Sequence, residues 1–472
     1  MHDLVGAYQR IDELYRLYIK SAFPLRSEIL NRERDELVAR QTVLSQPPLL
    51  EPNPIYPSEG INLSQAEARL SSDYAGISKI GQQLFPPGRH LYQHQWESIQ
   101  QVLENGKDLI VTTGTGSGKT ECFLLPLLAQ LVKESLSWPN ISTTPQGHEW
   151  WRQDNPTKRT SQWEHSERPP AMRALILYPL NALVEDQLMR LRMVLDDDDT
   201  HQWLDANRGG NRITFGRYTG QTPIPGIEGL QRIRRLGREL RRSDGTYSQV
   251  LEELTKNPDL PPETRYFFPR LDGAEMWSRW DMQETPPDIM ITNYSMLNIM
   301  MMRSIEKNIF EQTKNWLSEE GHPERQFFLI IDELHSYRGT PGTEVAYIVR
   351  LLLSRLGLSV DSPQLRVLGT SASLNDDEDG RRFLKEFFGR DPQNFHLVNT
   401  PQTPTQPDAA TLAEPYATAF RDFAISVQPE PTKGSPLLTD PTVTTAMGTL
   451  AQELGRLKQQ EPNEIALGEG ER

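Results

Sequence analysis

The chain has 472 residues, a formal net charge of −14, 36% hydrophobic and 24% charged residues, and a single cysteine, Cys122. This length allows two or three domains of roughly 150 residues each, and no apolar run approaches the ~20 residues that cross a bilayer. One cysteine excludes an internal disulfide or a cysteine-rich zinc site, which favours a cytoplasmic location. The acidic charge argues against a generally basic nucleic-acid binder, so any strand binding must come from a local groove.

Residues 1–79 are predicted to form an N-terminal helical region followed by a proline-rich connector. Apolar side chains recur every three or four residues over 3–20, which is typical of an amphipathic helix, and a second, polar helix is expected over 25–43. The proline-rich segment at 46–60 predicts an extended connector.

Over residues 80–390 short apolar strands alternate with helices. Strands are predicted at 107–113, 173–179, 212–218, 288–293, 327–333 and 366–372, and helices at 118–135, 180–195 and 342–357. Strands that are apolar on both faces and separated by helices indicate a mostly parallel sheet covered on both sides. We therefore predict an α/β fold, whose ligands bind at the carboxyl ends of the strands.

Two polar insertions interrupt this predicted domain, at about 138–170 and 224–284. The first contains four tryptophans, which we interpret as anchors of the insertion to its own domain rather than as platforms for base stacking. They are Trp138, Trp150, Trp151 and Trp163. Residues 391–472 are predicted to form a proline-rich, weakly helical C-terminal extension.

The second insertion opens with an arginine-dense helix, LQRIRRLGRELRR, at 230–242. Two hypotheses remain open for it. The helix either contacts DNA or a partner protein, or is a solvated helix paired with the acidic runs at 196–199 and 376–379.

A phosphate-binding loop is predicted at TGTGSGKT (113–120), between an apolar strand and an apolar helix. Consecutive backbone N–H groups and the helix N-terminus form a site for anions. We expect Lys119 to neutralise the β- and γ-phosphates of ATP, and the Thr120 hydroxyl to bind Mg²⁺. The other expected ATP contacts in this loop are Thr115, Gly116, Ser117 and Gly118.

An acidic pair follows the apolar strand in FFLIIDELHSYRG (327–339). In a phosphate-loop enzyme, Asp332 holds Mg²⁺ and Glu333 polarises the attacking water, so both are expected catalytic residues together with Lys119. His335 is expected near the γ-phosphate or a coupling segment, with a purely structural histidine as the alternative.

A candidate adenine contact lies upstream, in LYQHQWESI (91–99). The primary amide of Gln95 matches the donor and acceptor pattern of the adenine edge, and Tyr92 is placed to stack on the base.

Seven short motifs occur in one order: LYQHQ, TGTGSGKT, YPLNALVEDQ, YTGQTP, ITNYSML, DELH and TSAS. In this order the chain resembles superfamily-2 DExH-type helicases over about 80–390, which implies a RecA-like ATP-binding lobe. Thr113 departs from the glycine of the general phosphate-loop pattern, a change that helicase loops tolerate. The motifs look most similar to MrfA-type DNA repair helicases and to large bacterial anti-phage defence helicases, such as those of Druantia and DISARM.

The resemblance implies a strand-binding groove that contacts the nucleic-acid backbone with little base recognition. Its expected residues are Pro179, Asn181, Leu183, Thr219, Gly220, Thr292 and Asn293. The resemblance also implies that Ser371 and Ser373 couple the nucleotide state to the groove. DNA is the expected partner, although the motifs do not distinguish it from RNA.

A complete motor of this kind has a second RecA-like lobe with arginine fingers, and no matching helix follows residue 390. We expect the chain to be a fragment or one half of a split motor. Alone it should hydrolyse ATP weakly, since such fingers increase the rate of hydrolysis by a factor of about 10³–10⁵. Expected partners are a second lobe and subunits of a defence complex.

The leading hypothesis is thus the first lobe of an ATP-dependent DNA helicase or translocase, with ATP and Mg²⁺ as cofactors. The alternatives are a regulatory ATP-binding switch and a docking subunit without translocase activity.

Overall fold

The computed structural model describes residues 56–399 apart from 87, 115, 142–146, 180, 258–259 and 338. Outside that range it describes 27–39, 409–426 and scattered positions among 10–19, at 44 and among 445–452. The chain divides into two units, Met1–Ile55 and Tyr56–Arg472. In the first unit, helix α2 (Glu28–Ala39) lies inside the predicted helix at 25–43. The predicted helix at 3–20 falls mostly outside the described residues.

The second unit is built on a seven-stranded sheet in which all neighbouring strands are parallel. Strands β3, β4, β7 and β8 are buried along their whole length. Such strands need cover on both faces, which the flanking helices supply. From one edge to the other the order is β5 (Phe215–Arg217), β6 (Ile289–Asn293), β4 (Ala174–Tyr178), β7 (Phe327–Ile331), β8 (Leu365–Thr370), β3 (Asp108–Val111) and β9 (Phe395–Val398).

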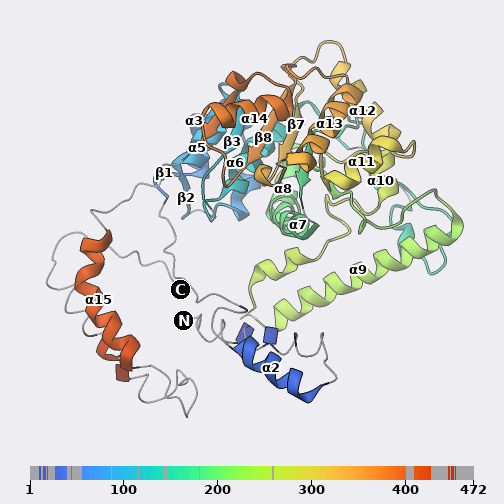
Figure 1. Cartoon of the computed structure of the whole chain (residues 1–472). Helices are drawn as coiled ribbons and strands as arrows, with labels where there is room; N and C mark the ends of the chain where they lie inside the picture. Colours follow the sequence, from blue (N-terminus) through green and yellow to red (C-terminus); the bar gives the residue numbers. More distant parts are fainter. Residues whose placement is uncertain are drawn as a thin grey trace. The chain divides into compact units, whose positions relative to one another are not determined.

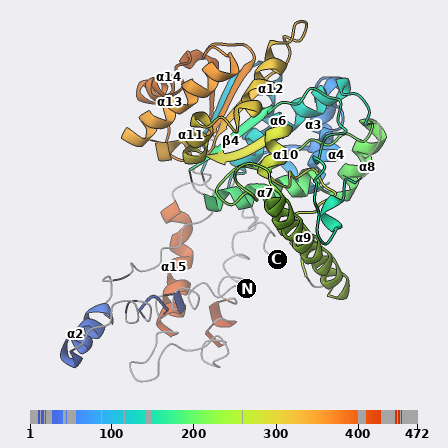
Figure 2. The same ribbon diagram turned by 90° about the vertical axis from the view of Figure 1, so that its right-hand side faces the viewer.

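Helices cover both faces of the sheet, and each layer has its own apolar core. Figure 1 labels the elements, and Figure 2 shows α11, α13 and α14 on one side of β4 and α6 on the other. One layer contains α5 (Gln93–Leu103), α6 (Lys119–Glu134), α7 (Asn181–Leu195) and α8 (Asp198–Asn207). The other contains α10 (Arg279–Glu284), α11 (Tyr294–Met302), α12 (Lys307–Ser318), α13 (Gly339–Leu356) and α14 (Glu378–Phe388).

The sheet domain begins earlier than the predicted boundary at residue 80. Strands β1 (Ser58–Asn62) and β2 (His90–Tyr92) pair antiparallel, and helices α3 (Leu63–Arg69) and α4 (Ile77–Ile80) lie between them in the chain. Apolar side chains of this segment are buried in the same core as α6. The sequence gives little warning of this, because each element here is seven residues or shorter.

All six predicted strands are present, although β5 is shorter than predicted. The sheet also continues past the predicted end at residue 390, because β9 pairs with β3 along its whole length. Helix α15 (Ala409–Ser426) lies in the predicted C-terminal extension. Within the described residues, no helix combines the length and the apolar character needed to cross a membrane.

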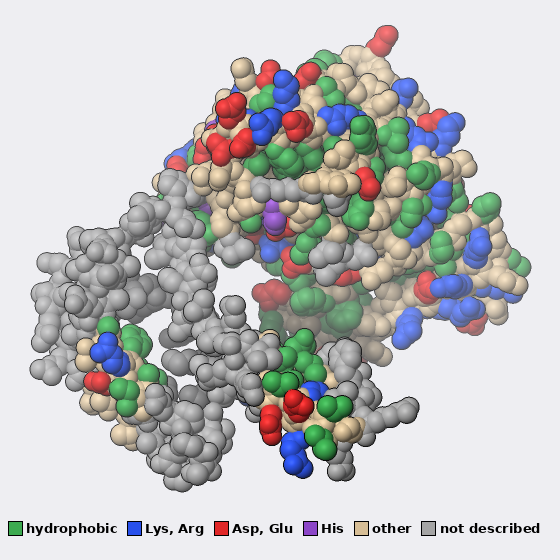
Figure 3. Space-filling view, viewed as in Figure 1, with side chains coloured by type: hydrophobic (Ala, Val, Ile, Leu, Met, Phe, Trp, Pro, Cys, Tyr) green, Lys and Arg blue, Asp and Glu red, His purple; other side chains and the backbone are tan. Residues whose placement is uncertain are grey.

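The two insertions share one small core. In the second insertion, α9 (Leu230–Lys256) buries Leu236 and Leu240 against Trp150 and Trp151 of the first. All four tryptophans of the first insertion are buried, which confirms that they anchor the insertion rather than offer platforms for bases. Lys and Arg side chains are prominent on the surface in this part of the molecule, at the right of Figure 3.

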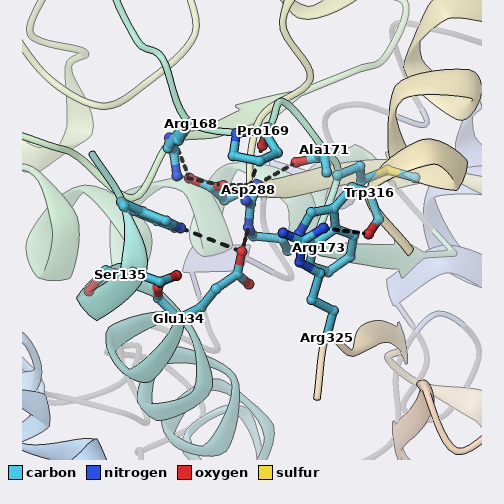
Figure 4. A network of polar contacts seen from close by, with 12 residues as sticks. Glu134, Ser135, Arg168, Pro169, Ala171, Arg173, Asp288, Trp316 and Arg325 are labelled. Atoms are coloured by element: carbon cyan, nitrogen blue, oxygen red, sulfur yellow. Dashed lines mark hydrogen bonds and ion pairs between the residues drawn. The ribbon is translucent and has the colours of Figure 1, made fainter. Parts of the chain in front are cut away.

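A buried ionic network joins the first insertion to the amino-terminal ends of β4 and β6. Asp288 is fully buried and accepts hydrogen bonds from both terminal nitrogens of Arg168, at 3.0 and 2.7 Å, and from Arg173 at 2.8 Å. Arg173 also donates to Glu134 of α6 at 2.7 Å. Figure 4 shows these side chains converging on Asp288, with Trp316 beside Arg173. The network lies at the edge of the sheet opposite to the predicted motifs.

Short 3₁₀ helices complete the described elements. They are η1 (Ser72–Tyr74), η2 (Gly81–Gln83), η3 (Ser135–Ser137), η4 (Trp150–Arg152), η5 (Pro262–Phe267), η6 (Leu334–Tyr337) and η7 (Pro392–Asn394).

Candidate nucleotide and strand site

The carboxyl ends of the strands carry the predicted motifs in two adjoining groups. The phosphate loop follows β3, the acidic pair follows β7 and the Ser-Ala-Ser segment follows β8, and these strands are neighbours in the order β7-β8-β3. The segments predicted to bind nucleic acid follow β5, β6 and β4, which are also neighbours. Because parallel strands end at one edge, this edge has a nucleotide half beside a strand-binding half.

The phosphate loop has the backbone geometry of an anion cradle. Gly116 and Gly118 have φ values of 77° and 76°, in the left-handed region that glycine adopts without steric cost. A Cβ at Gly118 would lie 2.3 Å from Nε2 of Gln95, whereas a Cβ at Gly116 would meet nothing within 4 Å. Helix α6 starts at Lys119, so its free N–H groups face the loop. Thr115 lies outside the described residues.

Buried side chains brace the loop from beneath. Nε2 of His94 lies 2.7 Å from the carbonyl oxygen of Ser117, and the hydroxyls of Thr113 and Ser117 are 2.6 Å apart. Burial lowers the pKa of His94, so a neutral imidazole donates its Nε2–H to this carbonyl. Thr113 therefore has a defined bracing role at the position where the general pattern has glycine.

The surroundings of the Lys119 ammonium group suit the expected binding of the β- and γ-phosphates of ATP. Its Nζ is buried and has no hydrogen-bond partner among the described residues. A buried ammonium without a partner is costly, and the charge of a phosphate group would relieve that cost. Thr120, in the first turn of α6, accepts a 3.4 Å hydrogen bond from Nε2 of Gln187.

The acidic pair is fixed by the last residue of β8. The Thr370 hydroxyl donates a hydrogen bond to Oδ1 of Asp332 and accepts one of 3.1 Å from the backbone N–H of Glu333. Glu333 has a φ of 53°, a left-handed conformation that costs roughly 1–2 kcal/mol in a residue with a Cβ. The hydroxyl therefore fixes the carboxylate of Asp332 and holds Glu333 in a backbone conformation that the chain alone disfavours.

Burial raises the pKa of Asp332, while the hydrogen bond from Thr370 and the positive charge of Lys119 oppose this rise. Additional positive charge near the carboxylate, such as a bound divalent cation, would favour its ionised form. The hydroxyl of Thr120 and the carboxylate of Asp332 are hard oxygen donors of the type that Mg²⁺ prefers, so the donor set fits this ion.

His335 connects the acidic pair to the Ser-Ala-Ser segment. Its Nδ1 lies 3.2 Å from Oε2 of Glu333 and accepts a 3.4 Å hydrogen bond from the backbone N–H of Ala372. Next to it, the N–H of Ser371 donates to the carbonyl of Val111 at the end of β3, at 2.9 Å. His335 is expected near the γ-phosphate or near the coupling segment. Its contact with Ala372 places it beside the coupling segment.

Ser371 is buried and its hydroxyl accepts a 3.3 Å hydrogen bond from the N–H of Ser373, which is exposed. The segment after β8 is thus bonded to the end of β3 and, through His335, to the acidic pair. The predicted coupling residues therefore contact both motifs of the nucleotide half, the end of β3 and the acidic pair.

The upstream glutamine does not lie as predicted. Gln95 is fully buried; its Oε1 accepts from the N–H of Tyr92 at 3.0 Å and its Nε2 donates to the carbonyl of Gly118 at 3.4 Å. This geometry leaves the amide no open edge for adenine and makes it a link between α5 and the phosphate loop. The ring of Tyr92 stacks on His94 at 5.4 Å, so one of its two faces is occupied.

In the strand half, most predicted side chains point inward. Thr219 and Thr292 are fully buried, and the Thr292 hydroxyl donates to the carbonyl of Tyr218 at 2.6 Å. Oδ1 of Asn293 caps α11 by accepting from the N–H of Met296 at 2.7 Å. These side chains therefore shape the edge rather than reach a phosphate directly. Gly220 is exposed, with open space around its Cα.

Pro179 is half-buried directly after β4, and Leu183 packs against the core of the α6 layer. Asn181 begins α7, but its side chain is outside the described part of the chain.

Sequence reasoning missed three residues of the site: His94, Gln187 and Thr370. Each lies within one of the seven motifs: His94 in LYQHQ, Gln187 in YPLNALVEDQ and Thr370 in TSAS. Their roles depend on contacts between segments that are distant in sequence, and local spacing does not encode such contacts.

Comparison with known proteins agrees with these motifs. Residues 92–213 match the DEAD/DEAH box helicase family. The chain is 30% identical over 469 residues to Druantia protein DruE of Escherichia coli (strain UMEA 4076-1), covering 90% of this chain and 23% of that protein. It is 21% identical over 353 residues to the uncharacterized ATP-dependent helicase MJ1574 of Methanocaldococcus jannaschii, covering 75% of this chain and 35% of that protein.

Among solved structures, the DUF1998 helicase MrfA bound to DNA and AMPPNP is 19% identical, with a TM-score of 0.39, covering 75% of this chain and 32% of that one. The chain thus spans about a quarter to a third of the length of these relatives. The matched residues 92–213 contain the phosphate loop, and the chain is thus similar to superfamily-2 helicases of the DEAD/DEAH box class.

Proposed function

We propose that this chain is the first motor lobe of an ATP-dependent DNA helicase or translocase. It binds Mg-ATP at the ends of β3 and β7 and a nucleic-acid backbone at the ends of β4, β5 and β6. The observation that carries this proposal is the buried, unpartnered Nζ of Lys119 beside a glycine-rich loop and an acidic pair.

In the nucleotide half, Lys119 and the backbone N–H groups from Gly116 to Thr120 bind the β- and γ-phosphates. The Thr120 hydroxyl and the Asp332 carboxylate hold Mg²⁺, which supplies charge neutralisation of the phosphates when bound. Glu333 accepts a hydrogen bond from the attacking water and so orients it toward the γ-phosphorus. Thr370 keeps Asp332 and Glu333 in place for both tasks.

In the strand half, we assign backbone contacts to Pro179, Asn181 and the exposed Gly220. The buried Thr219 and Thr292, with Asn293, hold these segments at the carboxyl edge of the sheet. Contacts made mainly by backbone groups suit tracking along a strand without base recognition. We assign to Ser371 and Ser373 the transmission of the nucleotide state toward this half, starting from their contacts with the end of β3 and, through His335, with the acidic pair.

Efficient turnover requires arginine fingers from a second RecA-like lobe, on a partner chain or on another part of the same protein. Such fingers add about 10³–10⁵ in rate in comparable phosphate-loop enzymes. The 472-residue chain alone is expected to bind ATP and hydrolyse it slowly, and rapid DNA-stimulated turnover by the purified chain would contradict this.

The direct test of nucleotide binding is Lys119→Ala. Affinity for a fluorescent non-hydrolysable ATP analogue should fall about 100-fold, equivalent to about 2.7 kcal/mol. The melting temperature without nucleotide should not fall, because the ammonium makes no hydrogen bond or ion pair with the described residues. Lys133→Ala is the matched control, since Lys133 lies on the same helix and pairs with Asp73 at 3.1 Å. Equal affinities of the Lys119→Ala and Lys133→Ala proteins would refute the phosphate site.

Binding of labelled single-stranded DNA, with and without the ATP analogue, separates a motor lobe from a regulatory or docking subunit. A motor lobe binds the strand, with an affinity that depends on the nucleotide. Absence of strand binding in both states would instead favour a subunit that binds ATP without acting on nucleic acid.

We further propose a role in anti-phage defence, supported by the similarity to a Druantia protein. The native gene cluster should protect cells from phage, and Lys119→Ala in this chain should remove that protection at unchanged protein level. Full protection by the Lys119→Ala cluster would show that nucleotide binding by this lobe serves another purpose.

A further inference from the structure

Helix α9 of the second insertion has one apolar face, which is fixed to the domain. Ile233, Leu236 and Leu240 are buried and form a core with Trp150 and Trp280. Their spacing of three and four residues places them along one side of the helix. The opposite side therefore faces away from the insertion core.

This outward side carries a stripe of arginines: Arg235, Arg238 and Arg242. All three are exposed and are spaced by three and four residues. Arg235 pairs with Glu239 at 2.8 Å, with side-chain exposures of 63% and 39%. Arg238 and Arg242 form no ion pair or side-chain hydrogen bond with any residue that the structure describes. Exposed basic side chains are visible in this region in Figure 3.

The acidic runs that might have neutralised the helix are engaged elsewhere. In the run at 196–199, Asp197 pairs with Arg265 at 2.7 Å and Asp198 pairs with Arg270 at 2.7 Å. In the run at 376–379, Asp376 and Asp379 pair with arginines of α14, and Asp377 caps that helix. The hypothesis of a solvated helix paired with these runs is therefore wrong, and Arg238 and Arg242 of the stripe have no ionic partner among the described residues.

The insertion is attached to the strand half of the carboxyl edge. A terminal guanidinium nitrogen of Arg279 donates to the carbonyl of Thr219 at 2.6 Å, and the indole N–H of Trp280 donates to the carbonyl of Gly226 at 2.6 Å. The 27 residues of α9 span about 40 Å, and Figures 1 and 2 show the helix extending away from the sheet. Nucleic acid leaving the strand half can thus meet the helix.

We propose that Arg235, Arg238 and Arg242 contact the phosphate backbone of nucleic acid beyond the strand-binding half, so that α9 is a second contact surface. The proposal rests on the proposed function. The stripe runs from Arg235 to Arg242, a rise of about 10 Å along the helix axis, over which one strand of a B-form duplex presents about three phosphates. Arginine binds phosphate through two parallel N–H groups. A helix that contacts only phosphates adds affinity without sequence preference.

The experiment compares Arg238→Gln/Arg242→Gln with the wild-type chain on two probes. One probe is a single strand of about eight nucleotides, a length within the usual size of single-strand binding sites. The other is the same strand joined to a longer duplex. Lys307→Gln/Lys314→Gln removes the same charge from exposed positions on α12 and serves as the control, and affinity for an ATP analogue checks that each variant is folded.

With the longer probe, affinity of the arginine variant should fall roughly 10-fold at about 0.1 M salt, and the slope of log K against log salt should decrease in magnitude by about 2. With the short strand the variant and wild type should agree. Equal salt slopes for the arginine variant, the lysine control and the wild type would overturn the proposal and leave an acidic protein as the occupant of the stripe. If the wild type binds neither probe, the proposed function itself fails.

Discussion

Thr370 connects the two residues expected to hold the metal ion and to orient the water. Its hydroxyl is bonded to Asp332 and to the N–H of Glu333, and Glu333 adopts a left-handed backbone at φ 53°. Strain of this kind persists only where neighbouring contacts hold it. A side chain at the end of β8 therefore sets the geometry of a site at the end of β7.

We expect Thr370→Val to reduce hydrolysis far more than binding. The substitution keeps the shape of the side chain but leaves a buried carboxylate oxygen and an N–H group without partners, at a cost of about 1–3 kcal/mol. Single-turnover ATP hydrolysis should slow by at least about 10-fold, while ATP affinity changes by less than about 5-fold.

Thr370→Ser is the matched control because it retains the hydroxyl, and its rate should stay near that of the wild type. A Thr370→Val protein that hydrolyses ATP at the wild-type rate would show that the acidic pair holds its position without this bond. A parallel loss of melting temperature would instead point to a general packing defect.

At this scale the sequence predicts which residue types gather but not the direction of each side chain. Lys119, Asp332 and Glu333 lie at the same edge of the sheet, because motifs that follow parallel strands come together there, and their catalytic roles stay predictions. Gln95 and Thr292 point inward instead. Their bonding partners are Gly118 and Tyr218, which lie 23 and 74 residues away along the chain.

At the scale of elements, the buried network around Asp288 connects α6, β4 and β6. Asp288 receives hydrogen bonds from Arg168, Arg173 and the backbone N–H of Thr214, the last at 2.7 Å. Arg168 is stacked 3.8 Å from the centre of the Trp138 ring. Removing one member of such a network leaves buried charges uncompensated.

Asp288→Asn should destabilise the domain by about 3–5 kcal/mol, because two buried guanidinium groups lose their shared carboxylate. Urea unfolding followed by tryptophan fluorescence measures the change in the free energy of unfolding. Glu239→Gln, which breaks the exposed pair with Arg235, should change that free energy by less than about 1 kcal/mol. A loss below about 1 kcal/mol in Asp288→Asn would show that the network contributes specificity rather than stability.

The strands of this sheet are predictable because β4 and β7 are continuous apolar runs, buried on both faces. Strand β9 is missed because it has four residues next to a proline-rich segment. The shared core of the two insertions is missed for another reason. This core packs α9 against Trp150, about 80 residues away along the chain. Helical periodicity identifies the apolar face of α9 but not the tryptophans that cover it.

At the scale of the whole domain, three histidines with a lowered pKa occur at functionally different places. His94 braces the phosphate loop, while His148 and His165 lie in the first insertion with ring centres 5.6 Å apart. Burial lowers the pKa of each below the ordinary value of 6.5. The folded chain therefore keeps them neutral where the unfolded chain binds protons.

The sign of the resulting pH dependence follows from proton binding. Below about pH 6.5 the unfolded state binds more protons at these histidines than the folded state, so they lower the free energy of unfolding as the pH falls toward their lowered pKa values. Each histidine contributes at most about 1.4 kcal/mol per pH unit. His148→Gln/His165→Gln should therefore reduce the loss of stability between pH 6.5 and 5 by up to about 2.7 kcal/mol per pH unit, measured by urea unfolding at each pH. If the double variant keeps the wild-type slope, protonation of the two insertion histidines does not limit the stability of this domain in acid.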